Sequence, residues 1–172
     1  MKFIADLVTE HPAFRDLEPS QHALIAGCGR NRVFRNGEML MREGEDADLF
    51  YAIRKGRVRL SVHLPDRGDA VIETLDEGEI VGLSWLFPPY KVRFDACAIG
   101  AVRSIAFDGK CLRGKCDADP RLGYTLMKSF AEVMTTRLQG TRLRMLDVYA
   151  STASGGGTAP GARTGTGAGS GA

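Results

Sequence analysis

The residues of this chain that could do chemistry are scattered and do not form a catalytic set. They are Cys28, Cys97, Cys111, Cys116, His11, His22 and His63. Zinc and iron–sulfur sites draw their ligands from closely spaced groups, whereas the closest cysteine pair here has four residues between its members and no further ligand nearby. No signature combines a nucleophile, a base and an orienting acid. The sequence therefore predicts no enzyme, no metal site and no cofactor.

The composition is that of one ordinary globular domain. Of 172 residues, 44% are hydrophobic and 26% are charged. The formal net charge of +2 is too small to indicate nucleic-acid binding. No stretch approaches the roughly 20 apolar residues of a membrane helix, and Asp6 interrupts the place of a secretory apolar core. We expect a cytoplasmic protein with no membrane segment.

Turn residues recur at short intervals between Arg32 and Phe107, which predicts a small β-barrel or β-roll. These turns are Asn36-Gly37, Glu43-Gly44, Lys55-Gly56, Pro65-Asp66-Arg67-Gly68 and Glu77-Gly78. Residues 49–54 and 57–62 alternate in polarity on either side of Lys55-Gly56. We therefore predict a β-hairpin that reverses at Gly56.

Helices are predicted on both sides of the strands. Short ones are expected at 12–15 and 19–25, where a proline opens each segment, and another begins at an Asp108 cap. A long helix is expected over 119–149, about 30 residues and roughly 45 Å. Residues 1–150 are predicted to form one domain that includes this helix, and the Gly/Ala/Ser/Thr-rich stretch 151–172 a flexible tail.

The long helix carries an apolar stripe that predicts a homodimer. A helix of this length extends past what a small roll can cover, so part of its stripe needs a partner. The residues expected to face a second copy are Leu126, Phe130, Met134, Leu138 and Met145. The alternative is that the whole stripe packs on the roll.

The run from Leu49 to Leu60, with its Gly56 turn, resembles the β-roll hairpin of cyclic-nucleotide-binding domains. Such domains occur in the catabolite activator family, in bacterial ligand-gated channels and in kinase regulatory subunits. The resemblance covers about residues 10–149. It implies an α+β, mainly β fold, a cyclic-nucleotide-binding double-stranded β-helix (a jelly-roll-like β-roll) with N-terminal helices and a long C-terminal helix.

The stretch 82–90, Gly-Leu-Ser-Trp-Leu-Phe-Pro-Pro-Tyr, resembles a short, single-domain bacterial branch of this family. In the catabolite activator type, a helix-turn-helix domain follows the long helix and reads DNA. No such domain is recognisable after Ala150. The resemblance therefore implies no direct sequence-specific DNA binding.

In the family, the cyclic phosphate of the ligand lies on a short helix after a glycine, where backbone N–H groups favour an anion. The resemblance assigns this phosphate cassette to Gly82, Leu83, Ser84, Trp85, Arg93 and Phe94. Arg93 matches the phosphate-binding arginine, whose guanidinium fork suits a phosphate. A cyclic nucleotide or another small anion is the implied ligand.

Two residues depart from the family pattern. Leu83 stands where a glutamate typically accepts the ribose 2′-hydroxyl, and Phe94 stands where a small hydroxyl residue commonly supports the phosphate. Leucine cannot accept a hydrogen bond, so a bound ribose would leave a polar group unpaired at a cost of about 1–3 kcal/mol. We expect weak or no binding of cAMP and cGMP.

Two further residues keep alternative interpretations. Arg93 either serves a surviving anion site or forms an ion pair with Asp95, two residues away on the same strand face. Thr141 matches the threonine that reaches the purine across the dimer in the catabolite activator. Its default role is an exposed hydroxyl or one bonded back to its own helix.

Two functions follow from these residues. The first is a non-catalytic cyclic-nucleotide-binding-like sensor or regulatory module with a degenerate phosphate cassette. The alternative is a ligand-free dimerisation or protein-interaction module. Gly82 and Arg93 favour the first, whereas Leu83 and Phe94 favour the second.

Overall fold

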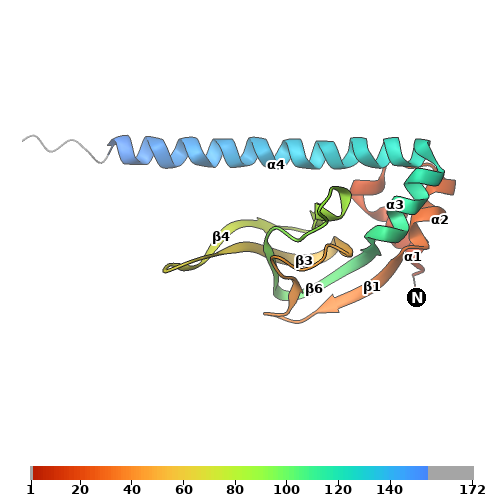
Figure 1. The fold of residues 1–172 in the computed structure, drawn as a ribbon, viewed down its shortest axis with the longest axis horizontal. Helices are drawn as coiled ribbons and strands as arrows, with labels where there is room; N and C mark the ends of the chain where they lie inside the picture. Colours follow the sequence, from red (N-terminus) through yellow and green to blue (C-terminus); the bar gives the residue numbers. More distant parts are fainter. Residues whose placement is uncertain (1, 155–172) are drawn as a thin grey trace, which may run out of the picture. The chain divides into compact units, whose positions relative to one another are not determined.

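The computed structural model describes residues 2–154, with side chains described as far as residue 146 (Figure 1). The chain divides into two compact units, Met1–Thr135 and Thr136–Ala172. All the described strands lie in the first unit, which is the β-roll predicted from the sequence. Residues 155–172 of the predicted tail lie outside the described residues.

Three short helical segments open the chain: α1 (Ile4–Glu10), η1 (Pro12–Phe14) and α2 (Pro19–Ala26). The second and third confirm predicted helices, and a proline opens each of them. Helix α1 was not predicted. Its first turn is closed by the Asp6 carboxylate, which accepts the Phe3 N–H at 3.0 Å.

The sheet is antiparallel throughout, with the strand order β1-β6-β3-β4. Strand β2 pairs with β6, and β5 pairs with β3. The strands are β1 (Gly29–Phe34), β2 (Met39–Met41), β3 (Leu49–Leu64), β4 (Gly68–Leu75), β5 (Ile80–Val81) and β6 (Asp95–Asp108). Strands β3 and β6 pair along most of their length, so they position everything attached to their ends.

The predicted reversal at Lys55-Gly56 is wrong. Strand β3 runs through both residues, and both of its halves pair with β6 rather than with each other. The pairing register shifts between Ile53 and Arg57, so Gly56 lies in an irregularity of one long strand. Its φ is +94°, and a Cβ there would lie 2.4 Å from the Ala101 carbonyl oxygen, so only glycine fits. The hairpin reverses later, between Leu64 and Gly68.

An aromatic cluster forms the centre of the first unit. The Phe50 ring stacks against Trp85 and Phe107, with centroids 4.8 and 4.9 Å away. Phe130 meets both Phe50 and Trp85 edge-on at 6.0 Å. All four side chains are essentially inaccessible to solvent. The cluster therefore ties β3, β6, the cassette and the last helix of the unit into one core.

Helix α3 (Gly109–Ala118) follows β6 directly, and its start confirms the predicted cap. The Asp108 carboxylate accepts the Cys111 N–H at 2.7 Å. Helix α4 (Pro120–Ser154) follows after Asp119, whose carboxylate accepts the N–H groups of Arg121 and Leu122 at 3.1 and 3.3 Å. It continues past the predicted end at Tyr149.

The first part of α4 belongs to the core of the first unit. Leu122, Leu126 and Phe130 recur every four residues and are fully buried. The prediction that Leu126 and Phe130 face a second subunit is therefore wrong, because their own unit covers them. The remaining predicted dimer residues are exposed, with exposed fractions of 38% for Met134, 51% for Leu138 and 52% for Met145.

Cys28 and Cys111 form a disulfide, which the sequence analysis did not predict. They are 83 residues apart in sequence, and their Cα atoms lie 5.8 Å apart. No local spacing links them, because the β-roll alone brings the end of α2 beside the start of α3. Cys97 and Cys116 are free thiols.

Candidate phosphate cassette

The predicted cassette leaves β5 and returns to β6 as one irregular loop. Gly82 follows β5 directly, and Ser84–Leu86 form the short helix η2, closed by a bond from the Leu86 N–H to the Leu83 carbonyl at 3.2 Å. Tyr90 and Val92 then pair with the loop at 45–47 through backbone hydrogen bonds of 2.7 and 2.9 Å. Both ends of the cassette are thus attached to the sheet.

Gly82 is held in a conformation that favours glycine. Its φ is +82°, and a Cβ there would lie 2.4 Å from the Met41 Cε and 3.0 Å from the Met41 Sδ. Met41 lies on β2 opposite Ala96 of β6, and Ala96 comes three residues after Arg93 in the sequence. Met41 therefore links Gly82, at one end of the cassette, to β6, the strand that follows Arg93 at the other end.

Trp85 serves the core rather than the cassette surface. Its ring is 1% exposed and lies in the aromatic cluster, and its Nε1 has no hydrogen-bond partner among the described residues. The Trp85 carbonyl oxygen accepts a hydrogen bond of 2.5 Å from Arg113 Nη1 of α3. Among the predicted site residues, Trp85 is thus the anchor of η2.

Arg113 is a residue that the sequence analysis missed. Besides its bond to Trp85, its guanidinium carbon lies 4.2 Å from the centre of the Tyr90 ring, a cation–π contact. One side chain of α3 therefore holds both the start and the end of the loop that contains the two prolines. A short helix with several basic residues offered no signal that this one turns inward.

Arg93 and Phe94 form the open end of the cassette. Arg93 is exposed, and Phe94 is 43% exposed. Among the described residues, no carboxylate oxygen lies within 4.0 Å of the Arg93 guanidinium. Asp95 instead accepts the Glu43 N–H at 2.7 Å. The alternative in which Asp95 neutralises Arg93 is therefore wrong, because Asp95 caps the turn at 42–45.

Leu83 and Ser84 are half-buried, and the Leu83 side chain packs in part against the core. Leu83 therefore supplies an apolar wall between Gly82 and η2. An arginine that can hold an anion and a leucine that cannot accept a hydrogen bond thus belong to the same loop.

Thr141 takes its default role in the second unit. It is exposed, and its Oγ1 donates to the Arg137 carbonyl oxygen, four residues earlier, at 3.0 Å. The hydroxyl is thus hydrogen-bonded to the backbone of its own helix. A purine contact by Thr141 remains a prediction.

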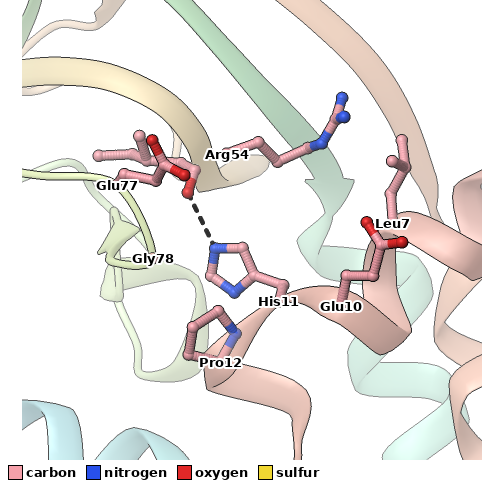
Figure 2. A pocket seen from close by; sticks show the side chains of 8 residues that line it. Leu7, Glu10, His11, Pro12, Arg54, Glu77 and Gly78 are labelled. Atoms are coloured by element: carbon pink, nitrogen blue, oxygen red, sulfur yellow. Dashed lines mark hydrogen bonds between the residues drawn. The ribbon is translucent and has the colours of Figure 1, made fainter.

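A cleft of about 380 Å³ lies outside the cassette and is lined in part by Glu77 and Gly78 of the turn that precedes β5 (Figure 2). Glu10, Arg54 and Glu77 project around it, and His11 lies at its floor (Figure 2). His11 Nδ1 accepts the Ala13 N–H at 3.3 Å, so its Nε2 donates to the Ile53 carbonyl at 3.1 Å. The same carbonyl accepts the Gly78 N–H at 2.8 Å, so His11 supports the turn that leads into the cassette.

Burial lowers the pKa of His11, the bond to Ile53 opposes that effect, and the nearby Arg54 charge adds to the lowering. A neutral imidazole with both nitrogens engaged has neither a free donor nor a free acceptor. His11 is therefore a structural residue here.

The described residues hold no cluster of three or more histidine, cysteine or acidic side chains placed to bind a metal ion. Within the same part of the chain, no helix combines the length and apolarity needed to cross a membrane.

A family model for the cyclic nucleotide-binding domain matches residues 31–119, just over half of the chain. The chain therefore belongs to the cyclic nucleotide-binding domain family. The matched residues run from β1 to the end of α3 and include the whole cassette.

One curated relative is a transcriptional regulator. A CRP-like cAMP-activated global transcriptional regulator of Mycobacterium tuberculosis is 25% identical over 135 residues, which are 78% of this chain and 58% of the relative. The chain thus spans less than two thirds of that relative's length.

Solved structures show the same fold. A Geobacter metallireducens protein assigned as cyclic nucleotide-binding superposes with a TM-score of 0.71 at 26% identity, covering 80% of this chain and 99% of that one. A cyclic nucleotide-binding domain from Methylobacillus flagellatus also reaches 0.71, at 18% identity and with 84% and 81% coverage.

Proposed function

We propose that this chain is a non-catalytic sensor or regulatory module whose phosphate cassette is altered, so that it binds cAMP and cGMP weakly or not at all. Arg93 carries the proposal. It is exposed at the open end of the family's cassette and has no ion-pair partner among the described residues. A free guanidinium fork is suited to a phosphate-like anion.

Leu83 supports the second half of the proposal. A ribose bound beside Leu83 would give up the water molecules that hydrogen-bond to its 2′-hydroxyl, and the leucine side chain offers no acceptor in exchange. The unpaired hydroxyl costs about 1–3 kcal/mol. That is roughly ten- to hundredfold in affinity. The partly exposed Phe94 ring adds bulk next to Arg93.

Isothermal titration calorimetry with cAMP, cGMP and inorganic phosphate tests this function. We expect dissociation constants above the micromolar range for both nucleotides, and loss of any anion binding in Arg93→Ala. Arg103→Ala, which removes an exposed arginine from β6, is the matched control and leaves binding unchanged. Submicromolar binding of either nucleotide overturns the proposal of an altered site.

The proposal includes a homodimer through the second unit, and the cytoplasmic location expected from the sequence. In this unit the apolar side chains of Leu138, Leu143, Met145 and Leu146 are all more than half exposed. Exposed apolar residues at such density are typical of an interface. Light scattering of the full chain at roughly tens of micromolar tests the dimer, and a monomer at that concentration contradicts it.

The second candidate function is a ligand-free interaction module, favoured by the same exposed residues. The two candidates differ in one observable. A sensor changes its apparent thermal stability with a small anion, because a ligand that binds only the native state stabilises it, whereas an interaction module does not.

A further inference from the structure

The disulfide lies where three parts of the first unit meet. Cys28 stands between the end of α2 and the start of β1, and Cys111 lies in the first turn of α3. The bond therefore fixes α3 to the N-terminal helices and the first strand. A hydrogen bond from Lys115 Nζ to the Leu24 carbonyl also links α3 to α2.

The bond borders a cleft on one side, where Cys28 is buried and Cys111 is half-buried. A cleft of about 280 Å³ borders both cysteines, and its other lining residues are Gly27, Gly29, Arg30, Leu49 and Asp108. This volume accommodates a small thiol, and the half-buried Cys111 is the sulfur that such a thiol would attack from the cleft. A disulfide that borders a cleft is accessible to thiol exchange, whereas one sealed in a core is not.

Helix α3 connects Cys111 to the cassette. Two residues after Cys111, Arg113 donates to the Trp85 carbonyl at 2.5 Å and lies over the Tyr90 ring at 4.2 Å. Trp85 in turn stacks in the aromatic core. A shift of the first turns of α3 therefore reaches η2 through the Arg113 side chain, and also through Gly109, where an added Cβ would lie 2.8 Å from the Trp85 Cβ.

We infer that Cys28–Cys111 is a reversible thiol–disulfide exchange site, and that its reduction loosens the hold of α3 on the phosphate cassette through Arg113. The exchange needs a thiol reductant. Any consequence for anion binding rests on the function proposed above, whereas the exchange itself and the response of Trp85 do not.

The chemistry balances with a dithiol such as dithiothreitol. One of its thiolates attacks a sulfur of the pair, the Cys28–Cys111 bond breaks, and a mixed disulfide and a cysteine thiolate remain. The second thiol of the reductant then closes its own ring and releases the other cysteine. Two electrons and two protons pass to the protein, which gains two thiols, and the reductant becomes a cyclic disulfide.

The remaining cysteines serve as controls within the same chain. Cys97 is buried in β6, and Cys116 is half-buried further along α3. Burial, with Asp117 and Asp119 nearby, raises the pKa of Cys116, which disfavours the thiolate. Cys97→Ser with Cys116→Ser therefore leaves a chain whose only thiol chemistry is that of the pair.

The experiment follows thiols and Trp85 together in this Cys97→Ser/Cys116→Ser chain. Trp85 is the only tryptophan of the sequence, so tryptophan fluorescence reports on the surroundings of η2 in the aromatic core. We expect no free thiol before dithiothreitol and two after it. We also expect Trp85 emission to shift to longer wavelength, the melting midpoint to fall by roughly 5–15 °C, and both to recover with oxidised glutathione.

Two variants assign the response. In a chain with Cys28→Ser and Cys111→Ser, emission already resembles the reduced state and does not change with dithiothreitol. In Arg113→Met, reduction still releases two thiols but changes Trp85 emission less than in the parent chain, because only the contact of Gly109 with Trp85 remains. If the double serine variant does not fold, the reversible change in the Cys97→Ser/Cys116→Ser chain still decides the matter.

The inference is overturned if the pair does not re-form with oxidised glutathione, or if reduction leaves Trp85 emission unaltered. It is also overturned if Arg113→Met responds as the parent chain does. A reversible Trp85 response without nucleotide or phosphate binding in either redox state would instead refute the proposed sensor function and leave the exchange site standing.

Discussion

Helix α4 has two stretches that look alike in sequence and differ in what covers them. Between 120 and 135, Leu122, Leu126 and Phe130 are fully buried. Between 136 and 146, Leu138 and Leu143 are 51% and 63% exposed. Both stretches place apolar residues at helical spacing. The difference teaches that an apolar stripe shows only that a helix has a face to cover, and leaves open what covers it.

The cassette divides in the same way. Gly82 and Trp85 are held by side chains of their own unit, Met41 against the glycine and Phe50 against the indole. Arg93 and Phe94 are exposed at the other end. Residues satisfied within the unit maintain the fold, and residues left open are the ones available for a ligand or a partner.

The largest expected effect is on the buried side of this comparison. Phe130→Ala removes a ring from the aromatic core and should lower the free energy of unfolding by about 3–5 kcal/mol. Leu138→Ala, the matched change on the exposed side, should alter it by no more than about 0.5 kcal/mol in dilute solution. Urea denaturation measures both. Similar losses in the two variants would show that the two stretches of α4 do not differ in this way.

Repairing the open end of the cassette should have the next largest effect. Leu83→Glu with Phe94→Ser supplies an acceptor for the ribose 2′-hydroxyl and a small hydroxyl beside Arg93. The glutamate gives up some packing of Leu83, so we expect a net gain of about 1–3 kcal/mol, or roughly ten- to hundredfold in affinity for cAMP. Calorimetry measures this gain.

The control for that repair is Arg93→Ala in the same background, which should abolish the gain because the phosphate loses its cationic partner. A double variant that is folded by circular dichroism but binds no better than the native chain would favour the interaction-module function instead.

The exposed stretch of α4 is tested through the proposed dimer. Leu138→Glu with Met145→Glu places two charges on that surface and should weaken self-association at least about tenfold, without lowering the stability of the first unit. Gln139→Glu adds a charge at an exposed polar position and should leave association unchanged. Sedimentation equilibrium distinguishes the three chains. Equal dissociation constants would place any interface elsewhere.

The smallest expected effect concerns His11, a buried residue whose ring nitrogens are hydrogen-bonded within the first unit. Its pKa is lowered in the folded state, so below about pH 6.5 the unfolded chain binds more protons than the folded one. The contribution of His11 is thus fully present above that pH and is lost as the pH falls through its folded pKa. Urea midpoints between pH 7 and pH 5 should decline less steeply in His11→Gln. A native slope in His11→Gln would mean that other groups cause the acid sensitivity.

Local chemistry in the sequence was sufficient for much of the fold. Proline at helix starts, Asp108 as a cap and Pro65–Gly68 as a turn act on their immediate neighbours, so the structure confirms them. The family resemblance was also readable, because the stretch 82–90 and Arg93 follow one another along one continuous loop, within the residues 31–119 that the family model matches.

Features set by distant neighbours were not readable. Gly56 resembles a hairpin turn locally, yet β6 pairs with both sides of it and keeps the strand running. Asp95 looks like a partner for Arg93, yet the Asp95 carboxylate accepts a hydrogen bond from the N–H of Glu43, 52 positions earlier in the sequence. In both cases the sequence offers a donor, an acceptor or a turn former, and the competing partner exists only after folding.

By itself, the sequence determined the family, the roll with its flanking helices, and the presence in one loop of an arginine and of a leucine that cannot accept a hydrogen bond. Only the tertiary structure decided that Phe130 lies in the core, that Cys28 meets Cys111, and that Arg113 holds the cassette. The physical reason is range. Turns, caps and periodicity depend on residues a few positions apart, whereas burial and cross-chain bonds depend on which surfaces the closed sheet brings together.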